Sequence, residues 1–185
     1  EKCADRQVDV LMANAGQGEG GEFLDQDWMA IKRTIDTNIT GTVSLIHKIG
    51  GTMRAADAGR ILVTGSIVDD IPGPFNLVYN STKAFVDDFC AGLSNELKDS
   101  DVVVSCLLPG LTDTRFFERA DMVDTFVGQS DAKADPAKVA KDGYDALLKG
   151  ETQKVSGLLN KVQHAFASVL PDDILAQMHR LAAKP

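Results

Sequence analysis

Three side chains that can together transfer a proton stand near the middle of the chain. Ser66, Tyr79 and Lys83 form the pattern Ser-x12-Tyr-x3-Lys. Because residues four apart share one helix face, the phenol and the ammonium are expected to lie side by side. An ammonium about 4 Å from a phenolate is worth roughly 4 kcal/mol, which lowers a tyrosine pKa from about 10 toward about 7. Such a tyrosine can exchange a proton with an alcohol or carbonyl oxygen, although an ordinary helix also produces Tyr-x3-Lys.

The elements that must position these residues follow an alternating order. Three short apolar runs, rich in β-branched residues, are predicted to be buried strands: Val8–Ala13, Arg60–Thr64 and Val102–Leu108. Helical periodicity fills residues 26–56 and 75–98 between them. This alternation predicts an α/β fold with a parallel sheet.

Beyond Pro109 the chain is predicted to be mostly helical and to continue the same single domain, residues 1–185. The expected elements are a helix at Pro136–Leu148, a short edge strand at Gln153–Ser156, and terminal helices at Leu158–Leu170 and Asp172–Ala183.

A special turn follows each of the three strong strands. These turns are Asn14-Ala15-Gly16, Gly65-Ser66 and Pro109-Gly110. In open parallel sheets, ligands bind beyond the carboxyl ends of the strands. We therefore expect the three turns and Tyr79 to gather around one ligand site at that edge.

Composition excludes several classes of partner. The net charge of −8 argues against nucleic acid or an anionic membrane as a partner. No apolar stretch approaches about 18 residues, and the first residues do not form a signal peptide. The three cysteines, Cys3, Cys90 and Cys106, are interpreted as core thiols of a cytoplasmic protein. The three histidines show no metal-ligand spacing, so no metal site is predicted.

These motifs together resemble the short-chain dehydrogenase/reductase family, which has a Rossmann-type doubly wound sheet and uses NAD or NADP. The matches run in order from Asn14 to Thr114: Asn14-Ala15-Gly16, Asn38 within Thr37–Gly41, Ser66, Tyr79 and Lys83, and Pro109–Thr114.

The resemblance implies roles for the matched residues. Tyr79 is the general acid or base, and Ser66 binds the substrate oxygen. Lys83 lowers the tyrosine pKa and, with Tyr79, lies at the nicotinamide ribose. Asn38 holds a water that relays protons from Lys83. The remaining matches would border the cofactor, with Asn14 open to a purely structural reading: Asn14, Ala15, Gly16, Pro109, Gly110, Thr112 and Thr114. Thr112 stands where the family often has valine or isoleucine, a tolerable change if the backbone makes the contact.

The chain departs from the family pattern at its beginning. The glycine-rich turn after the first strand is absent, and so are the first three strands. The expected fold is therefore the C-terminal portion of the domain, with a helical C-terminus. Val8–Ala13 would then be an exposed apolar edge, and we expect the missing residues to exist outside this sequence. Gly16–Gly21 satisfies Gly-x-Gly-x-x-Gly, but no acidic strand end follows it and Glu19 would repel a pyrophosphate, so it is not taken as a dinucleotide site.

Two functions remain open from the sequence. The first is an NAD(P)-dependent oxidoreductase that interconverts an alcohol and a carbonyl. The second is a truncated, non-catalytic relative that acts as an interaction domain. Residues 115–121 are expected to form a helix over the substrate cleft. Its neighbourhood is rich in large apolar side chains, which either bind a hydrophobic substrate or anchor a lid: Phe116, Phe117, Met122 and Phe126. The family habit favours a homodimer or homotetramer.

Overall fold

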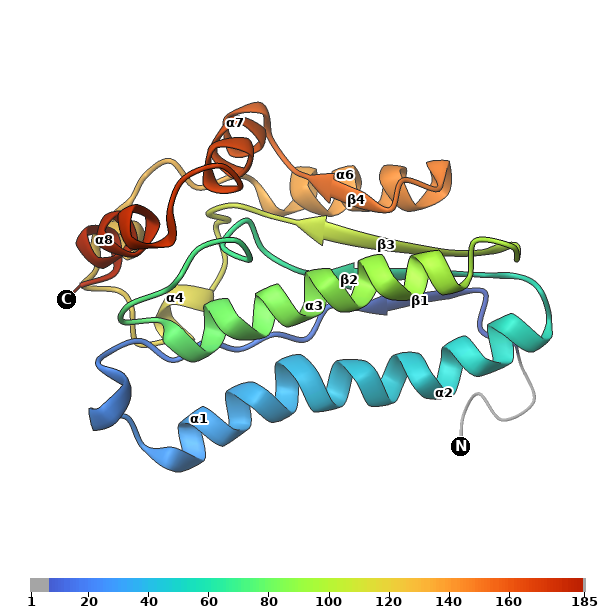
Figure 1. Ribbon diagram of the computed structural model, residues 1–185, viewed down its shortest axis with the longest axis horizontal. Coiled ribbons are helices and arrows are strands. Elements are labelled where there is room, and N and C mark those ends of the chain that lie inside the picture. The colour runs from blue at the N-terminus through green and yellow to red at the C-terminus, as the bar shows by residue number, and fades with distance from the viewer. Residues whose placement is uncertain (1–6, 185) are drawn as a thin grey trace.

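Four parallel strands form the centre of the molecule. The structure, a computed structural model, describes residues 7–184 (Figure 1). The strands are β1 (Val10–Ala13), β2 (Gly59–Thr64), β3 (Val102–Leu108) and β4 (Gln153–Val155), and they lie side by side in that order. The predicted α/β fold with a parallel sheet is confirmed, with small differences at the strand ends.

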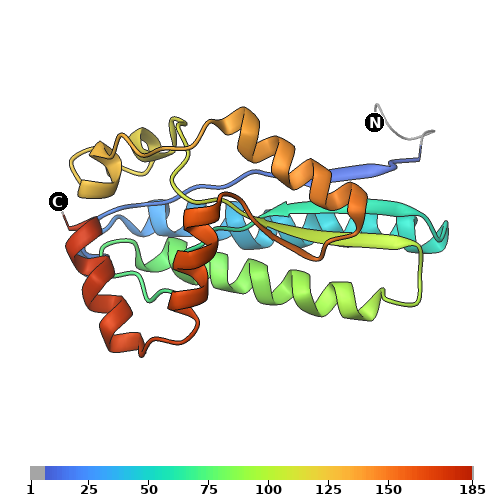
Figure 2. The same cartoon turned by 90° about the horizontal axis from the view of Figure 1, so that it is seen from above.

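Helices cover both faces of this sheet. On one face lie α1 (Trp28–Ile35), α2 (Thr42–Ala55) and α3 (Leu77–Glu96), and on the other lies α6 (Pro136–Lys149) (Figures 1 and 2). The main core lies between the sheet and α2 and α3, where apolar side chains from both layers interlock; its fully buried members include Met53, Ile61, Val63, Val104 and Leu108. Burial on both faces explains why the strands are continuous apolar runs.

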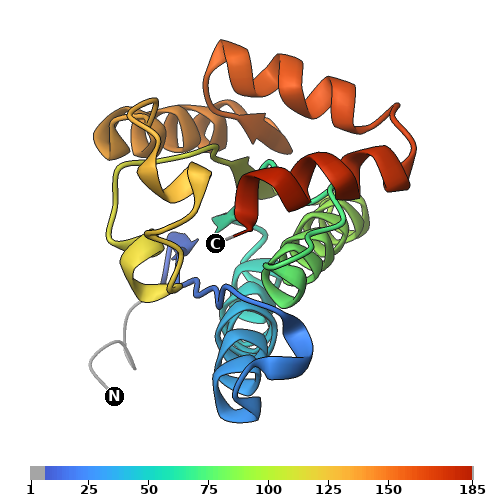
Figure 3. The same cartoon turned by 90° about the vertical axis from the view of Figure 1, so that its left-hand side faces the viewer.

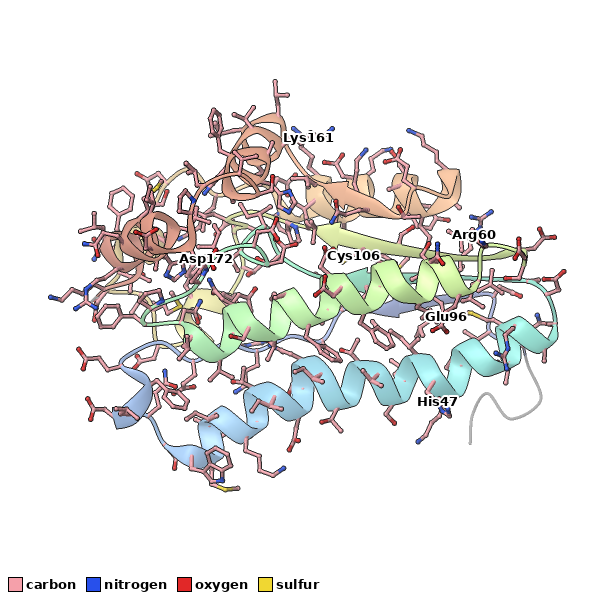
Figure 4. All side chains as sticks on the ribbon, in the orientation of Figure 1. His47, Arg60, Glu96, Cys106, Lys161 and Asp172 are labelled. Atoms are coloured by element: carbon pink, nitrogen blue, oxygen red, sulfur yellow. The ribbon has the colours of Figure 1, made fainter. Side chains whose placement is uncertain are left out.

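The interpretation of the cysteines as core thiols is confirmed for the two that the structure describes. Cys90 on α3 and Cys106 on β3, the latter labelled in Figure 4, are buried and free. The neighbouring Cys90 and burial raise the pKa of Cys106, which keeps it protonated. Cys3 lies outside the described residues.

The long helix predicted for residues 26–56 contains a bend. After the 3₁₀ turn η1 (Phe23–Asp25), α1 passes into a π-helical turn, η2 (Asp36–Gly41), and continues as α2. Thr37, Asn38 and Thr40 are poor helix formers, and this local weakness favours a bend here. π-Helical turns commonly occur at functional sites, and this one carries Asn38.

The C-terminal helices lie at the carboxyl ends of the strands. Two short helices, α4 (Phe116–Arg119) and α5 (Phe126–Gln129), precede α6. The hairpin of α7 (Leu158–Ala167) and α8 (Asp172–Ala183) follows β4, and α8 crosses in front of the sheet (Figure 3). The predicted helix at 158–170 ends earlier, at Ala167, because the chain turns before Pro171.

The β1 edge of the sheet is open. Within residues 7–184, β1 pairs only with β2, and Val10 and Met12 are 39% and 50% exposed. This agrees with the expected exposed apolar edge. Over the same part of the chain, no helix combines the length and apolar content that crossing a membrane would require.

Candidate active site

A cavity of about 1940 Å³ opens at the carboxyl ends of the strands. It brings together all but one of the predicted site residues: Asn14, Ala15, Gly16, Ser66, Tyr79, Lys83, Pro109, Gly110, Thr112 and Thr114. Asn38 does not line it, although its neighbour Thr37 does. The expectation of one site at this edge is therefore met in geometry.

Ser66 is placed at the cavity by a tight turn at the end of β2. The N–H of Gly65 donates to the carbonyl of Leu107 at 2.8 Å, and the N–H of Ile67 donates to that of Pro109 at 3.1 Å. A Cβ on Gly65 would lie 2.6 Å from the side chain of Leu108, so only glycine permits this approach. The buried Ser66 is thus held by its backbone neighbours.

Lys83 reaches the same region from the buried face of α3. Its Nζ donates to the carbonyl of Thr64 at 2.7 Å and lies 5.7 Å from the centroid of the Tyr79 ring. Burial disfavours the charged form and lowers the pKa of Lys83 to about 8. The predicted neighbourhood of tyrosine and lysine is confirmed as geometry.

The expected lowering of the Tyr79 pKa is wrong. Burial raises the pKa of Tyr79 to about 12, and the interaction with the Ser66 hydroxyl offsets only part of that rise. The spacing argument assumed a lysine ammonium about 4 Å from the phenolate, whereas this one bonds Thr64. Tyr79 is therefore a neutral phenol near pH 7, the form that donates a proton.

Asn38 fixes the loop beside the cavity through three hydrogen bonds. Its Oδ1 accepts from the N–H of Gln17, and its Nδ2 donates to the carbonyl of Gln17 and to Oγ1 of Thr82, each at 2.8 Å. The side chain is 1% exposed. All its polar atoms are engaged with protein, and the water relay stays a prediction.

Asn14 makes a structural link between two strand ends. Its Oδ1 accepts from Oγ1 of Thr64 at 2.9 Å, which joins the ends of β1 and β2. Next to it, a Cβ on Gly16 would lie 3.5 Å from Nζ of Lys83. The structural reading of Asn14 is supported, while its contact with a cofactor stays a prediction.

The family follows from comparison with known proteins. The sequence profile of the short chain dehydrogenases matches residues 2–123. The chain belongs to this family. It is 35% identical over 121 residues to human 17-beta-hydroxysteroid dehydrogenase type 1, an alignment that covers 64% of this chain and 36% of that protein. It is also 35% identical over 116 residues to sulfoacetaldehyde reductase 2 of Chromohalobacter salexigens, which covers 60% of this chain and 45% of the relative.

Solved structures show the same fold. A short-chain dehydrogenase from Sphingobium yanoikuyae in complex with NADPH superposes with a TM-score of 0.77 at 24% identity and covers 91% of this chain and 68% of that one. One from Burkholderia phymatum in complex with NAD gives 0.76 at 19% identity, covering 97% and 70%. Compared with the human hydroxysteroid dehydrogenase and the sulfoacetaldehyde reductase, the chain spans less than half of the relative's length.

The short-chain dehydrogenase motif after β3 is held largely through its backbone. Thr112 forms a parallel bridge with Ala134, and its hydroxyl donates to the carbonyl of Gly110 at 2.9 Å. Oγ1 of Thr114 accepts from the N–H of Phe116 at the start of α4. A threonine at position 112 is therefore compatible with the interpretation that this position contacts the cofactor through its backbone.

The glycine-rich segment after β1 packs against protein. A Cβ on Gly18 would lie 2.9 Å from the ring of Phe116, and one on Gly20 would lie 2.8 Å from Met122. The N–H of Gly20 donates to the carbonyl of Ala120 at 2.7 Å. Close packing on the segment around α4 accounts for two of these glycines, which agrees with the rejection of a dinucleotide fingerprint here.

The apolar residues near α4 serve both predicted roles. Phe117 and Met122 are buried in a cluster with Phe75, as a lid anchor would be, and they also line the cavity. Phe116 lines the cavity as well and lies against Tyr79, with ring centroids 5.0 Å apart. Phe126 is 75% exposed.

Sequence reasoning missed a polar cluster whose neighbours along the chain, Val68, Ile71 and Gln163, line the cavity. His164 on α7 lies 3.2 Å from Oδ1 of Asp69 and 3.7 Å from Oδ2 of Asp70, measured from Nε2. Burial raises the pKa of Asp69 to about 6. The Asp69-Asp70 pair directly after the Ser66 turn was a signal, but spacing along the chain could not connect it to His164. The prediction of no metal site rested on that spacing alone.

Proposed function

We propose that the protein is an NAD(P)-dependent oxidoreductase that interconverts an alcohol and a carbonyl by hydride transfer. One observation carries the proposal: Ser66, Tyr79 and Lys83 come from two elements and converge on a single cavity. Membership of the short-chain dehydrogenase family supports it. We further infer a homodimer or homotetramer, which the family habit favours, and a cytoplasmic location, which the core thiols favour.

The described residues fit a nicotinamide cofactor. Nζ of Lys83 has three N–H donors, and among residues 7–184 it uses one, on Thr64. Gly16 lines the cavity without a side chain, so its backbone is accessible to a flat ring. When bound, the nicotinamide supplies or accepts the hydride. The same cavity has room for a substrate beside it.

In the reduction direction, Tyr79 gives its phenolic proton to the carbonyl oxygen. The Ser66 hydroxyl donates a hydrogen bond to that oxygen and stabilises the charge that develops there. The raised pKa of Tyr79 keeps it protonated until this moment. Nζ of Lys83, 5.7 Å from the Tyr79 ring centroid, brings a positive charge near the phenolate that forms.

The substrate is expected to be a small molecule with an apolar body. Phe116 lines the cavity beside Tyr79, and the α7–α8 hairpin adds Leu158, Phe166 and Met178. The named relatives act on chemically different substrates, so the argument for a hydrophobic one rests on this lining.

Replacement of the phenol tests the proposal. Tyr79→Phe keeps the ring and removes the proton, so turnover of a ketone panel with NADH or NADPH should fall about 10²–10⁴-fold. Tyr144→Phe is the matched control, because Tyr144 is 43% exposed on α6. Circular dichroism checks that both variants fold.

Retained turnover in Tyr79→Phe would contradict the assigned role. A folded wild-type protein that binds neither dinucleotide and turns over nothing would instead favour the interaction domain. The ratio of kcat/KM with the two cofactors would decide between NAD and NADP.

A further inference from the structure

A histidine and two carboxylates meet where α7 contacts the loop after Ser66. His164 comes from α7, whereas Asp69 and Asp70 belong to the loop between β2 and α3. Nε2 of His164 and one carboxylate oxygen of each aspartate lie within 4.8 Å of one another. Two segments far apart in the sequence thus present three metal-ligating atoms to one point.

Two atoms of this cluster are buried without a hydrogen bond among the described residues. They are Oδ2 of Asp69 and Nε2 of His164. The Asp69 side chain is only 3% exposed and that of His164 is 16% exposed. Because a buried polar atom without a partner is costly, such atoms call for a ligand. Oδ1 of Asp69 is engaged by the N–H of Asp70 at 3.0 Å.

An ion pair between His164 and Oδ1 of Asp69 leaves the buried Oδ2 of Asp69 unexplained. Nε2 lies near both carboxylates, yet it makes a hydrogen bond to neither. Among residues 7–184, no lysine or arginine forms a salt bridge with Asp69 or Asp70. The two negative charges therefore lack a cation that is independent of the histidine.

We propose that Asp69, Asp70 and His164 bind a divalent zinc ion that fastens α7 to the Ser66 loop. Zinc binds imidazole nitrogen and carboxylate oxygen at about 2.0–2.2 Å in tetrahedral geometry, which separates ligand atoms by roughly 3.3–3.6 Å. The distances from Nε2 of His164 to Oδ1 of Asp69 and to Oδ2 of Asp70 are 3.2 and 3.7 Å. An imidazole ligand disfavours magnesium and calcium, which prefer oxygen. The fourth position is open to water, since the Asp70 side chain is 47% exposed.

The ion would organise the wall of the cavity. The N–H of Asp69 donates to the carbonyl of Ser66 at 3.3 Å, so this ligand is coupled to the catalytic turn. On the other side, α7 contributes Leu158 and Phe166 to the cavity lining. A bound ion would fix the distance between the two, and its role is structural.

Zinc binding to the chelator-treated protein tests this site. Titration calorimetry with zinc chloride is expected to give one ion per chain, and saturating zinc should raise the Tm by at least about 5 °C. His164→Gln and Asp69→Asn should each weaken zinc binding at least about 100-fold. Magnesium chloride should produce no comparable shift.

Two variants serve as matched controls (Figure 4). His47 is exposed on α2, far from the cluster. Asp172 lines a small pocket together with Asp69 and Asp70. His47→Gln and Asp172→Asn should bind zinc like the wild type. The proposal is overturned if the wild type binds no zinc, if His164→Gln and Asp69→Asn bind it unchanged, or if His47→Gln loses it equally. A protein that ignores zinc but loses stability in His164→Gln would show an imidazolium–carboxylate pair instead.

Discussion

Lys83 brings a positive charge into a position that is 4% exposed, and this burial has an energetic cost. Its pKa falls from an ordinary 10.5 to about 8. Below pH 8 both the folded and the unfolded chain carry the charge, so the whole cost is present. Between pH 8 and 10.5 the folded chain has lost the proton and the unfolded chain has kept it, so stability increases with pH.

Lys83→Met should therefore stabilise the protein near neutral pH while it abolishes turnover. Removing the buried charge stabilises the folded protein by roughly 3 kcal/mol, and losing the hydrogen bond to Thr64 destabilises it by about 1 kcal/mol. The difference in free energy of unfolding between variant and wild type should be about 1–2 kcal/mol at pH 7 and should shrink as the pH rises from 8 to 10.5.

Urea unfolding of the two proteins across that pH range measures this difference. A gap that does not change with pH, or a less stable variant at pH 7, would contradict it. Above pH 10 the titration of Tyr79 lowers the free energy of unfolding as the pH rises, because its pKa in the folded chain is raised to about 12. This effect is present in both proteins.

At this scale the sequence predicts which residues converge but not their charge states. Ser66, Tyr79 and Lys83 follow from motif spacing and strand ends. The direction of the tyrosine pKa shift does not, because it depends on burial and on the lysine bonding Thr64. The Asp69–His164 approach depends on how α7 packs, which no local pattern encodes.

At the scale of elements, the turn after β3 and the start of α7 meet in the wall of the cavity. A Cβ on Gly110 would lie 2.4 Å from Nδ2 of Asn160, which itself donates to the carbonyl of Ser156 at 2.7 Å. The first turn of α7 is therefore packed directly against the turn that follows β3.

Gly110→Ala should destabilise the protein by about 1–3 kcal/mol, because the added methyl must displace Asn160. Removing the obstruction in Gly110→Ala/Asn160→Ala should recover part of that loss. Gly92→Ala is the control, because Gly92 is exposed on α3 and an added Cβ would meet no neighbouring side chain within 4 Å. This substitution should stabilise the protein by about 0.5–1 kcal/mol. Thermal and urea unfolding provide the measurements, and a Gly110→Ala protein as stable as the wild type would disprove this packing.

Element prediction succeeded where one physical signal dominated. The apolar β-branched runs identified β2 and β3 because these strands are buried on both faces. The weak helix formers Thr37, Asn38 and Thr40 favour a bend, but no local pattern indicates that the bend takes π-helical form or that Asn38 bonds to Gln17 and Thr82.

At the scale of the whole molecule, the sheet stops at a strand suited to further pairing. β1 pairs only with β2 within the described residues, and its Val10 and Met12 side chains are half exposed. An open, apolar strand edge is a template for another strand. Relatives in the family are longer than this chain, and at this edge additional strands could pair.

The 185-residue chain, purified by itself, should therefore self-associate through β1. Size-exclusion chromatography with light scattering is expected to show a mass that increases with concentration. Met12→Lys should shift the chain toward monomer, because a lysine on an edge strand opposes pairing. Leu24→Lys adds the same charge at a side chain that is 91% exposed but lies in η1, away from the sheet, and should leave association unchanged. If both variants dissociate equally, general surface charge controls association rather than the strand edge, and if neither does, the contact lies elsewhere on the molecule.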